Sequence, residues 1–172
     1  VKEGRNSKEM KYERIPLEVS AKVDFISGTG LKVITGYRRG EGDDVIEKKD
    51  LRLTSDGGYA RFGNTFIPLP RKITPEQTKW LEKSHFTVPE DHIPEFFKRD
   101  LLLLKSNLTA VITPSCESIE ILEGGYQPSV RISADEPGWL DFEVEYKIRN
   151  YTLPHDLFAR NDFGYIHLDK RT

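Results

Sequence analysis

The stretch expected to organise this chain is Trp139-Leu140-Asp141-Phe142-Glu143-Val144-Glu145-Tyr146-Lys147-Ile148, in which apolar and polar residues alternate after Trp139. Successive side chains of a β-strand point to opposite faces, so the alternation predicts a strand with one buried and one solvated face. Val130 and Ile132 alternate in the same way before it, and Pro137-Gly138 is typical of a turn. Residues 128–150 are therefore predicted to form a hairpin, whose apolar row is expected to lie under helices.

The first seventy residues show the same alternation in shorter runs. Residues 17–25 and 31–35 are predicted to pair as a hairpin around Ser27-Gly28-Thr29-Gly30. Short edge strands are expected at residues 45–46 and 51–53. Gly63-Asn64 predicts a tight turn between the runs at 59–62 and 65–69.

The middle of the chain contains helix signals. Thr74-Pro75-Glu76-Gln77 has the residues of a capping box with Pro at the first helical position, so a helix is expected to run from there to about His85. A second helix is predicted over residues 91–105, and the C-terminal end of its four-leucine run is expected to be buried on several sides. Strands are expected at 109–113 and 117–122, a short helix at 153–160, and a closing strand at 165–168.

These patterns predict an α+β fold. It is expected to be mostly antiparallel β-sheet with two or three short helices, an N-terminal β-meander and a C-terminal α/β half. Residues 1–14 are predicted to be a charged lead-in, and residues 15–172 a single module with a sub-boundary near residue 72.

Composition narrows the function classes. The chain has 172 residues, 31% charged residues and a net charge of −2, so total charge alone predicts no nucleic-acid partner. The single cysteine, Cys116, excludes a disulfide framework or a cysteine zinc site within one chain. No apolar run approaches the roughly 20 residues that span a membrane, so no membrane partner and a cytoplasmic location are expected. The ends suggest a fragment of a longer protein.

Several motifs resemble the helicase-associated domain of bacterial Swi/Snf-type proteins. That family has a strand like residues 139–144, a short Leu-rich helix like that around Leu157-Phe158, and a closing strand like residues 164–169. Its earlier helix is matched by Ile93-Pro94-Glu95-Phe96-Phe97. The motif positions with an implied structural role are Trp139, Asp141, Phe142, Phe96 and Phe97. An Arg-Asp-x-x-x-Glu signature of the family is not recognisable here, so the N-terminal third is matched only by the order of its elements.

The resemblance implies a non-catalytic accessory region that precedes the ATPase motor of an ATP-dependent DNA helicase or translocase. The implied partners are the motor of the same polypeptide, and DNA or a protein. The chain itself has no Gly-x-x-x-x-Gly-Lys-Ser/Thr loop to hold nucleotide phosphates. We therefore expect no enzymatic activity and no cofactor in this segment.

Asp141, Glu143 and Glu145 form the best cluster of acids, on one face of the predicted strand. Their spacing would suit metal ligation or a glycosidase-like pair in a small hydrolase. A solvated face, paired with Arg131 and continued by Lys147, is the favoured interpretation because catalytic sites usually gather residues from several segments.

The histidines and other single residues give weaker signals. No two of His85, His92, His155 and His167 have the spacing of a zinc motif on a predicted helix, so surface or capping roles are expected. Cys116 is expected to be a buried, inert thiol. Trp139 either marks a contact surface or covers the core beneath the short helix; we favour the second interpretation.

One basic grouping could bind nucleic acid through phosphate contacts and stacking on Tyr37, Tyr59 and Phe62. Its members are Arg38, Arg39, Lys48, Lys49, Arg52, Arg61, Arg71 and Lys72. The acids between them are Glu41, Asp43, Asp44, Glu47 and Asp50. Because these acids would cancel much of the positive field, a mixed solvated face is favoured. A protein-interaction module without nucleic-acid binding therefore remains an alternative function.

Overall fold

The computed structural model describes residues 10–121, 126–136, 139–148, 151–154 and 165–167. The strands are β1 (Lys11–Tyr12), β2 (Glu18–Ile26), β3 (Gly30–Arg38), β4 (Val45–Ile46), β5 (Arg52–Leu53), β6 (Tyr59–Phe62), β7 (Thr65–Pro68), β8 (His85–Val88), β9 (Thr109–Ile112), β10 (Ile119–Ile121), β11 (Gln127–Glu136), β12 (Trp139–Ile148), β13 (Tyr151–Pro154) and β14 (Tyr165–His167). The helical elements are η1 (Lys48–Asp50), α1 (Pro75–Lys83), η2 (Glu90–His92), α2 (Ile93–Glu95), η3 (Phe96–Asp100), α3 (Leu101–Asn107) and α4 (Pro114–Glu117). The predicted α+β fold, rich in antiparallel sheet, is confirmed.

The main sheet is built on the β2–β3 hairpin. The two strands pair antiparallel from Glu18 opposite Arg38 to Ile26 opposite Gly30. Strand β9 joins β2 in parallel, whereas β4 and β8 both pair antiparallel with β3. Alternate residues of both strands, including Val23 and Val33, are fully buried and begin the hydrophobic core. Burial of this apolar row is the main favourable term holding the sheet to its helices.

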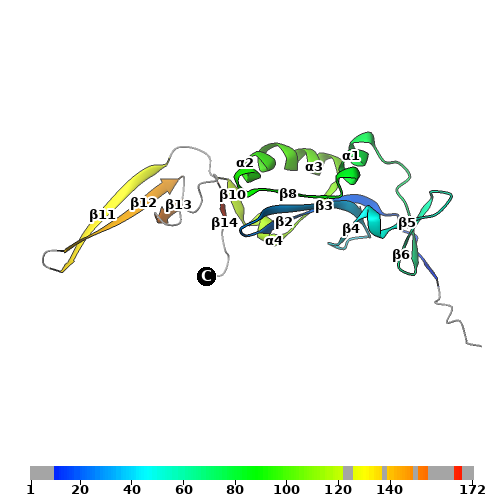
Figure 1. The fold of residues 1–172 in the computed structure, drawn as a ribbon, viewed down its shortest axis with the longest axis horizontal. Helices are drawn as coiled ribbons and strands as arrows, with labels where there is room; N and C mark the ends of the chain where they lie inside the picture. Colours follow the sequence, from blue (N-terminus) through cyan, green and yellow to red (C-terminus); the bar gives the residue numbers. More distant parts are fainter. Residues whose placement is uncertain (1–9, 122–125, 137–138, 149–150, 155–164, 168–172) are drawn as a thin grey trace, which may run out of the picture.

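The helices cover this sheet, as Figure 1 shows. Elements α2, η3 and α3 follow one another without a break and replace the single helix predicted for residues 91–105. Leu101 and Leu104 are buried, but Leu102 and Leu103 are exposed, so the C-terminal end of the run is buried on one side and not on several as predicted. A helix turns about 100° per residue, so only part of a continuous run can face one sheet.

Helix α1 begins with the predicted capping box. The Thr74 hydroxyl accepts from the Gln77 backbone N–H at 3.2 Å, and the Thr74 N–H donates to the Gln77 side chain at 2.9 Å. At its other end, the buried Thr35 hydroxyl shares its one proton between the Trp80 and Ser84 carbonyls, at 2.7 and 3.0 Å. These bonds satisfy backbone groups that a helix end otherwise leaves unpaired.

A second sheet, of four strands in the order β1-β7-β6-β5, lies beside the main one. Ala60 and Ile67 on its inner face are fully buried in the common core. Strand β1 lies within the predicted lead-in of residues 1–14 and pairs in parallel with β7, placing Tyr12 opposite Phe66. The inner apolar face therefore anchors this sheet and leaves its other face outward.

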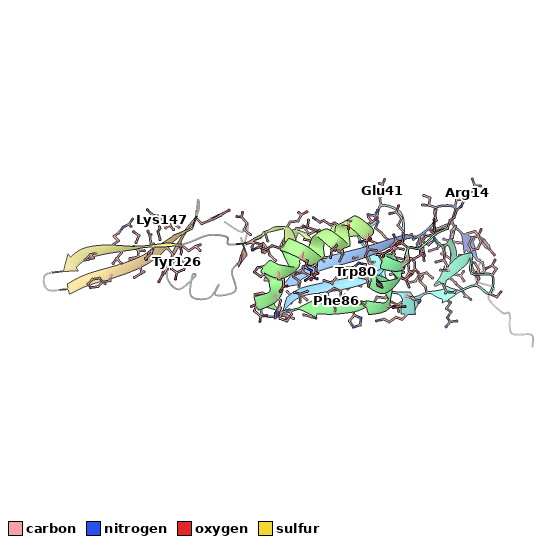
Figure 2. The ribbon with its side chains drawn as sticks, turned by 90° about the horizontal axis from the view of Figure 1, so that it is seen from above. Arg14, Glu41, Trp80, Phe86, Tyr126 and Lys147 are labelled. Carbon is pink, nitrogen blue, oxygen red and sulfur yellow. The ribbon has the colours of Figure 1, made fainter. Side chains whose placement is uncertain are left out.

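The predicted hairpin of residues 128–150 forms β11 and β12 of a third sheet, with β13 added at the edge of β12. The expected cover of helices over its apolar row is wrong. Phe142 is 63% exposed, and both ribbon views place this sheet apart from the helices (Figures 1 and 2). Alternation shows that a strand has one apolar and one polar face, but it does not show which of the apolar faces in the chain the helices cover.

The C-terminal part differs from the sequence prediction at two further places. Leu153 is in strand β13 and pairs with Tyr146, so the helix expected from residue 153 does not begin there, and residues 155–160 lie outside the described residues. Pro114–Glu117 forms the short helix α4, which delays the next strand to Ile119. The closing strand β14 pairs antiparallel with β10.

The leucine run offers a matched test of the core. Leu104→Ala should lower the free energy of unfolding by about 2–5 kcal/mol, because it opens a cavity in a fully buried position. Leu102→Ala, in the same helix but exposed, should change it by less than about 0.5 kcal/mol. Urea denaturation of both variants measures the difference, and equal effects would contradict the packing of α3.

Candidate functional site

The fold neutralises part of the predicted basic grouping. Arg38 pairs with Glu18 at 3.0 Å, and Lys49 pairs with Glu47 at 2.9 Å. Arg39 pairs with Glu13. These cations are tied to nearby carboxylates, so they add little positive field for a ligand.

Arg52 and Arg61 are brought together. They are directly opposite each other on the antiparallel strands β5 and β6, so their side chains leave the same face of the sheet. With Asp50 and Gly63 they line a cavity of about 260 Å³. The Arg61 Nε–H donates to the Gly63 carbonyl at 3.0 Å, which orients that guanidinium. Like charges in directly opposed positions repel, so an anion bound here would relieve the repulsion.

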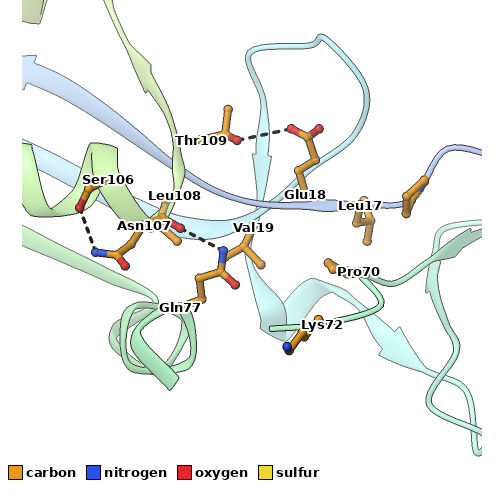
Figure 3. Close-up of a pocket in the computed structure, with 11 residues that line it drawn as sticks. Leu17, Glu18, Val19, Pro70, Lys72, Gln77, Ser106, Asn107, Leu108 and Thr109 are labelled. Carbon is orange, nitrogen blue, oxygen red and sulfur yellow. Dashed lines mark hydrogen bonds between the residues drawn. The ribbon is translucent and has the colours of Figure 1, made fainter. Parts of the chain in front are cut away.

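The remaining cations lie elsewhere. Lys48 is exposed in η1, and Arg71 is exposed in the loop after β7. Lys72 lines a different cavity, of about 370 Å³, together with Glu18 and Gln77 (Figure 3). In that cavity the Gln77 amide donates to the Asn107 carbonyl at 3.0 Å. The eight predicted cations therefore do not form one surface.

The aromatic residues beside Arg61 differ from those that the sequence predicted. Tyr37 is buried in the core, and Phe62 is on the same face as Ala60, so neither accompanies Arg61. Pairing across the sheet instead aligns Tyr12, Phe66, Arg61 and Arg52 in one row, which we call the aromatic–arginine row. The rings of Tyr12 and Phe66 stack with centroids 5.1 Å apart. Sequence reasoning missed Tyr12 and Phe66 because only the sheet order brings β1 and β7 beside β6.

Two of the interleaved acids, Glu47 and Asp50, take different positions relative to the arginines. Glu47 accepts hydrogen bonds from Ser84 at 2.7 Å, Lys49 at 2.9 Å and His85 at 3.1 Å. The Ser84 and Lys49 bonds, with a smaller contribution from His85, lower the pKa of Glu47 to about 2. Asp50 is the one carboxylate among the described residues that line the cavity beside Arg52 and Arg61.

The acidic residues of β12 are paired across the hairpin with serine and arginine residues of β11, and not with other acids. Asp141, Glu143 and Glu145 are opposite Ser133, Arg131 and Ser129, with Arg131 Nη1 at 3.7 Å from Glu143 Oε2. Within the ranges that the structure describes, no group of three or more His, Cys, Asp or Glu residues is placed to hold a metal ion. The arrangement matches a solvated, partly paired face.

The other candidate residues take separate positions. His92 is exposed beside Asp91, at 2.8 Å, and this hydrogen bond raises the pKa of His92. His167 is in β14, and His155 lies outside the described residues. Cys116 is fully buried, and burial raises the pKa of its thiol to about 11, which keeps it protonated at neutral pH.

The motif residues shared with the Swi/Snf-type family are divided between the core and the hairpin. Phe96 is buried, and Phe97 packs edge-on against it with ring centroids 6.5 Å apart. Trp139 begins β12, whereas Asp141 and Phe142 are exposed further along it.

Comparison with models of protein families, with curated proteins and with solved structures finds no match to this chain. None of the helices in the described part of the chain is both long and apolar enough to cross a bilayer. The residues themselves must therefore support any functional proposal.

The Glu47 cluster predicts acid-dependent stability. Because the pKa of Glu47 is lower in the folded protein than its ordinary value of 4.5, its stabilisation is present above about pH 4.5 and is lost as pH falls towards 2. Glu47→Gln should lower the free energy of unfolding by about 1–2 kcal/mol at pH 7, and the difference should shrink in acid. Denaturation curves between pH 7 and pH 2 measure this effect.

Glu41→Gln in the exposed loop is the matched control and should leave stability nearly unchanged. A constant difference between the Glu47→Gln variant and the native chain at every pH would contradict the assigned cluster.

Proposed function

We propose that this chain is a non-catalytic accessory domain of a bacterial, cytoplasmic Swi/Snf-like ATP-dependent DNA helicase or translocase. In this proposal the hairpin sheet β11-β12-β13 docks on the ATPase motor of the same polypeptide and positions it. The observation that carries the proposal is an apolar sheet face that the rest of the described chain leaves exposed.

The face is continuous across the hairpin. Ile132 is opposite Phe142, and Val130 is opposite Val144, so all four side chains leave the same side of the sheet. Val130, Ile132 and Phe142 are 56%, 59% and 63% exposed. The exposed apolar surface ends towards β13, where Leu153 lies opposite Tyr146 and is buried. A contiguous exposed apolar patch of this kind marks an interaction surface.

The chemistry of the two faces favours a protein partner for the apolar one. Covering a large apolar side chain completely contributes about 1.5–3 kcal/mol, so each of these half-covered residues would contribute roughly 1 kcal/mol on docking. The opposite face contains Arg131, Glu143 and Lys147 and is suited to water. A polyanion would gain little from the apolar face, whereas an apolar protein surface would gain from it.

The resemblance supplies the identity of that partner. The strand that carries Phe142 and Asp141 is the one whose sequence is similar to the Swi/Snf-associated family. In those proteins the accessory region precedes a motor on the same chain. The nucleotide chemistry would come from that motor, because these 172 residues contain no phosphate-binding loop of the usual kind.

The docking face can be tested in the parent polypeptide. Ile132→Ser/Phe142→Ser should abolish cross-links between Lys147 and the motor and change the DNA-stimulated ATPase rate several-fold, because the variant removes apolar area from the contact. Cross-linking mass spectrometry and ATPase assays measure the two effects. Ser133→Ala/Asp141→Ser, which alters the opposite side of the same two strands, should leave both unchanged.

Two results would overturn the proposal. An encoding gene without a phosphate-binding loop would reject a motor as the parent. Unchanged cross-links in the Ile132→Ser/Phe142→Ser variant, with folding verified by circular dichroism, would reject the hairpin as the docking element.

A further inference from the structure

We infer that the outward face of the four-stranded sheet β1-β7-β6-β5 binds single-stranded nucleic acid. Bases stack on its exposed aromatic rings, and phosphates contact Arg52 and Arg61. This inference goes beyond the proposed function, because it concerns a different sheet and stands whether or not the hairpin docks on a motor.

The first supporting observation is the register of the sheet. Arg52 is opposite Arg61, Arg61 is opposite Phe66, and Phe66 is opposite Tyr12, so the aromatic–arginine row crosses all four strands on one face. Adjacent strands are about 4.8 Å apart, and the row is therefore about 14 Å long. That length accommodates two or more consecutive nucleotides.

The second observation is the exposure of the rings. Tyr12 is 71% exposed, although its stacking on Phe66 at an interplanar angle of 15° holds the ring in place. Tyr59 is two residues from Arg61 in β6, so it leaves the same face, and it is also exposed. Rings held in place at a surface lose little entropy when a base stacks on them, and stacking accepts any base.

The third observation is the charge. Arg52 is exposed and has no ion pair among the described residues, and Arg61 is held by the Gly63 carbonyl and not by a carboxylate. Their cavity of about 260 Å³ has room for a phosphate group and is lined by the two arginines, Gly63 and one carboxylate, that of Asp50. Guanidinium groups match phosphate oxygens in geometry and charge.

The combination favours an unpaired strand over a duplex. Stacking on Tyr12 requires a free base face, and the bases of a duplex cover each other's faces. A phosphopeptide would use the two arginines but would leave the aromatic end of the row unused. Single-stranded DNA and single-stranded RNA share the required chemistry, and the experiment compares them.

Fluorescence anisotropy with labelled single strands of about 15 nucleotides, one DNA and one RNA, tests the inference on the 172-residue chain. Arg52→Gln/Arg61→Gln should weaken binding roughly tenfold. It should also reduce the slope of log affinity against log salt by about 1.4, because each phosphate contact on a single strand contributes about 0.7. Tyr12→Ala should weaken binding roughly five-fold or more, whereas Tyr12→Phe should retain it.

Matched variants separate this site from general charge. Arg131→Gln/Lys147→Gln makes the same change in net charge on the polar face of the hairpin and should leave affinity and salt slope unchanged. Arg52→Lys/Arg61→Lys keeps the charge and should retain most of the binding. If the glutamine variant does not fold, Tyr12→Ala against Tyr12→Phe supplies the loss-of-binding comparison. The tighter of the two labelled strands identifies which nucleic acid this face binds.

Three results would overturn the inference. The first is equal binding by the Arg52→Gln/Arg61→Gln and Arg131→Gln/Lys147→Gln variants. The second is that a duplex binds as tightly as the single strand and that Tyr12→Ala does not weaken the binding of the duplex. The third is displacement of the oligonucleotide by a phosphopeptide at equal phosphate concentration. Each of these results leaves the docking proposal untouched, since the assay contains no motor.

Discussion

The pairing of β2 with β3 is the constraint on which the rest of the main body depends. These two nine-residue strands place Val23 opposite Val33, both fully buried, and every other strand of their sheet attaches to one of them. The attachment of β9 to β2 joins residues about ninety positions apart, with the Ser20 hydroxyl donating to the Thr109 carbonyl. Such long-range pairing costs loop-closure entropy, which burial of the shared apolar row offsets.

The fold also separates acidic and basic residues that are close together in the sequence. Glu47, which follows β4 directly, accepts hydrogen bonds from Ser84 and His85 at the C-terminal end of α1. The hairpin of β5 and β6 then sets Arg52 directly against Arg61. Two repelling guanidinium groups are kept in place by the buried inner face of their sheet, where Ala60 and Ile67 have no exposed surface.

The two proposed surfaces differ in chemistry and therefore suit different partners. The hairpin exposes Val130, Ile132 and Phe142, which we propose contact an apolar protein surface; the smaller sheet presents rings and guanidinium groups, which we propose contact an unpaired strand. Figure 1 places them at opposite ends of the molecule. One partner at each end would let the domain link a motor to the strand on which the motor works.

Short stretches of sequence were enough to predict the local structure: the capping box at Thr74, the alternation within β2 and β12, and the α+β class that these patterns imply. These features depend on residues a few positions apart, whose geometry the backbone dictates. Which apolar row is covered depends on how the sheets and helices pack together: Phe142 stays exposed, whereas Val23 is buried. Packing also places Tyr12 in the same row as Arg61, since strand order, and not spacing along the chain, sets neighbours across a sheet.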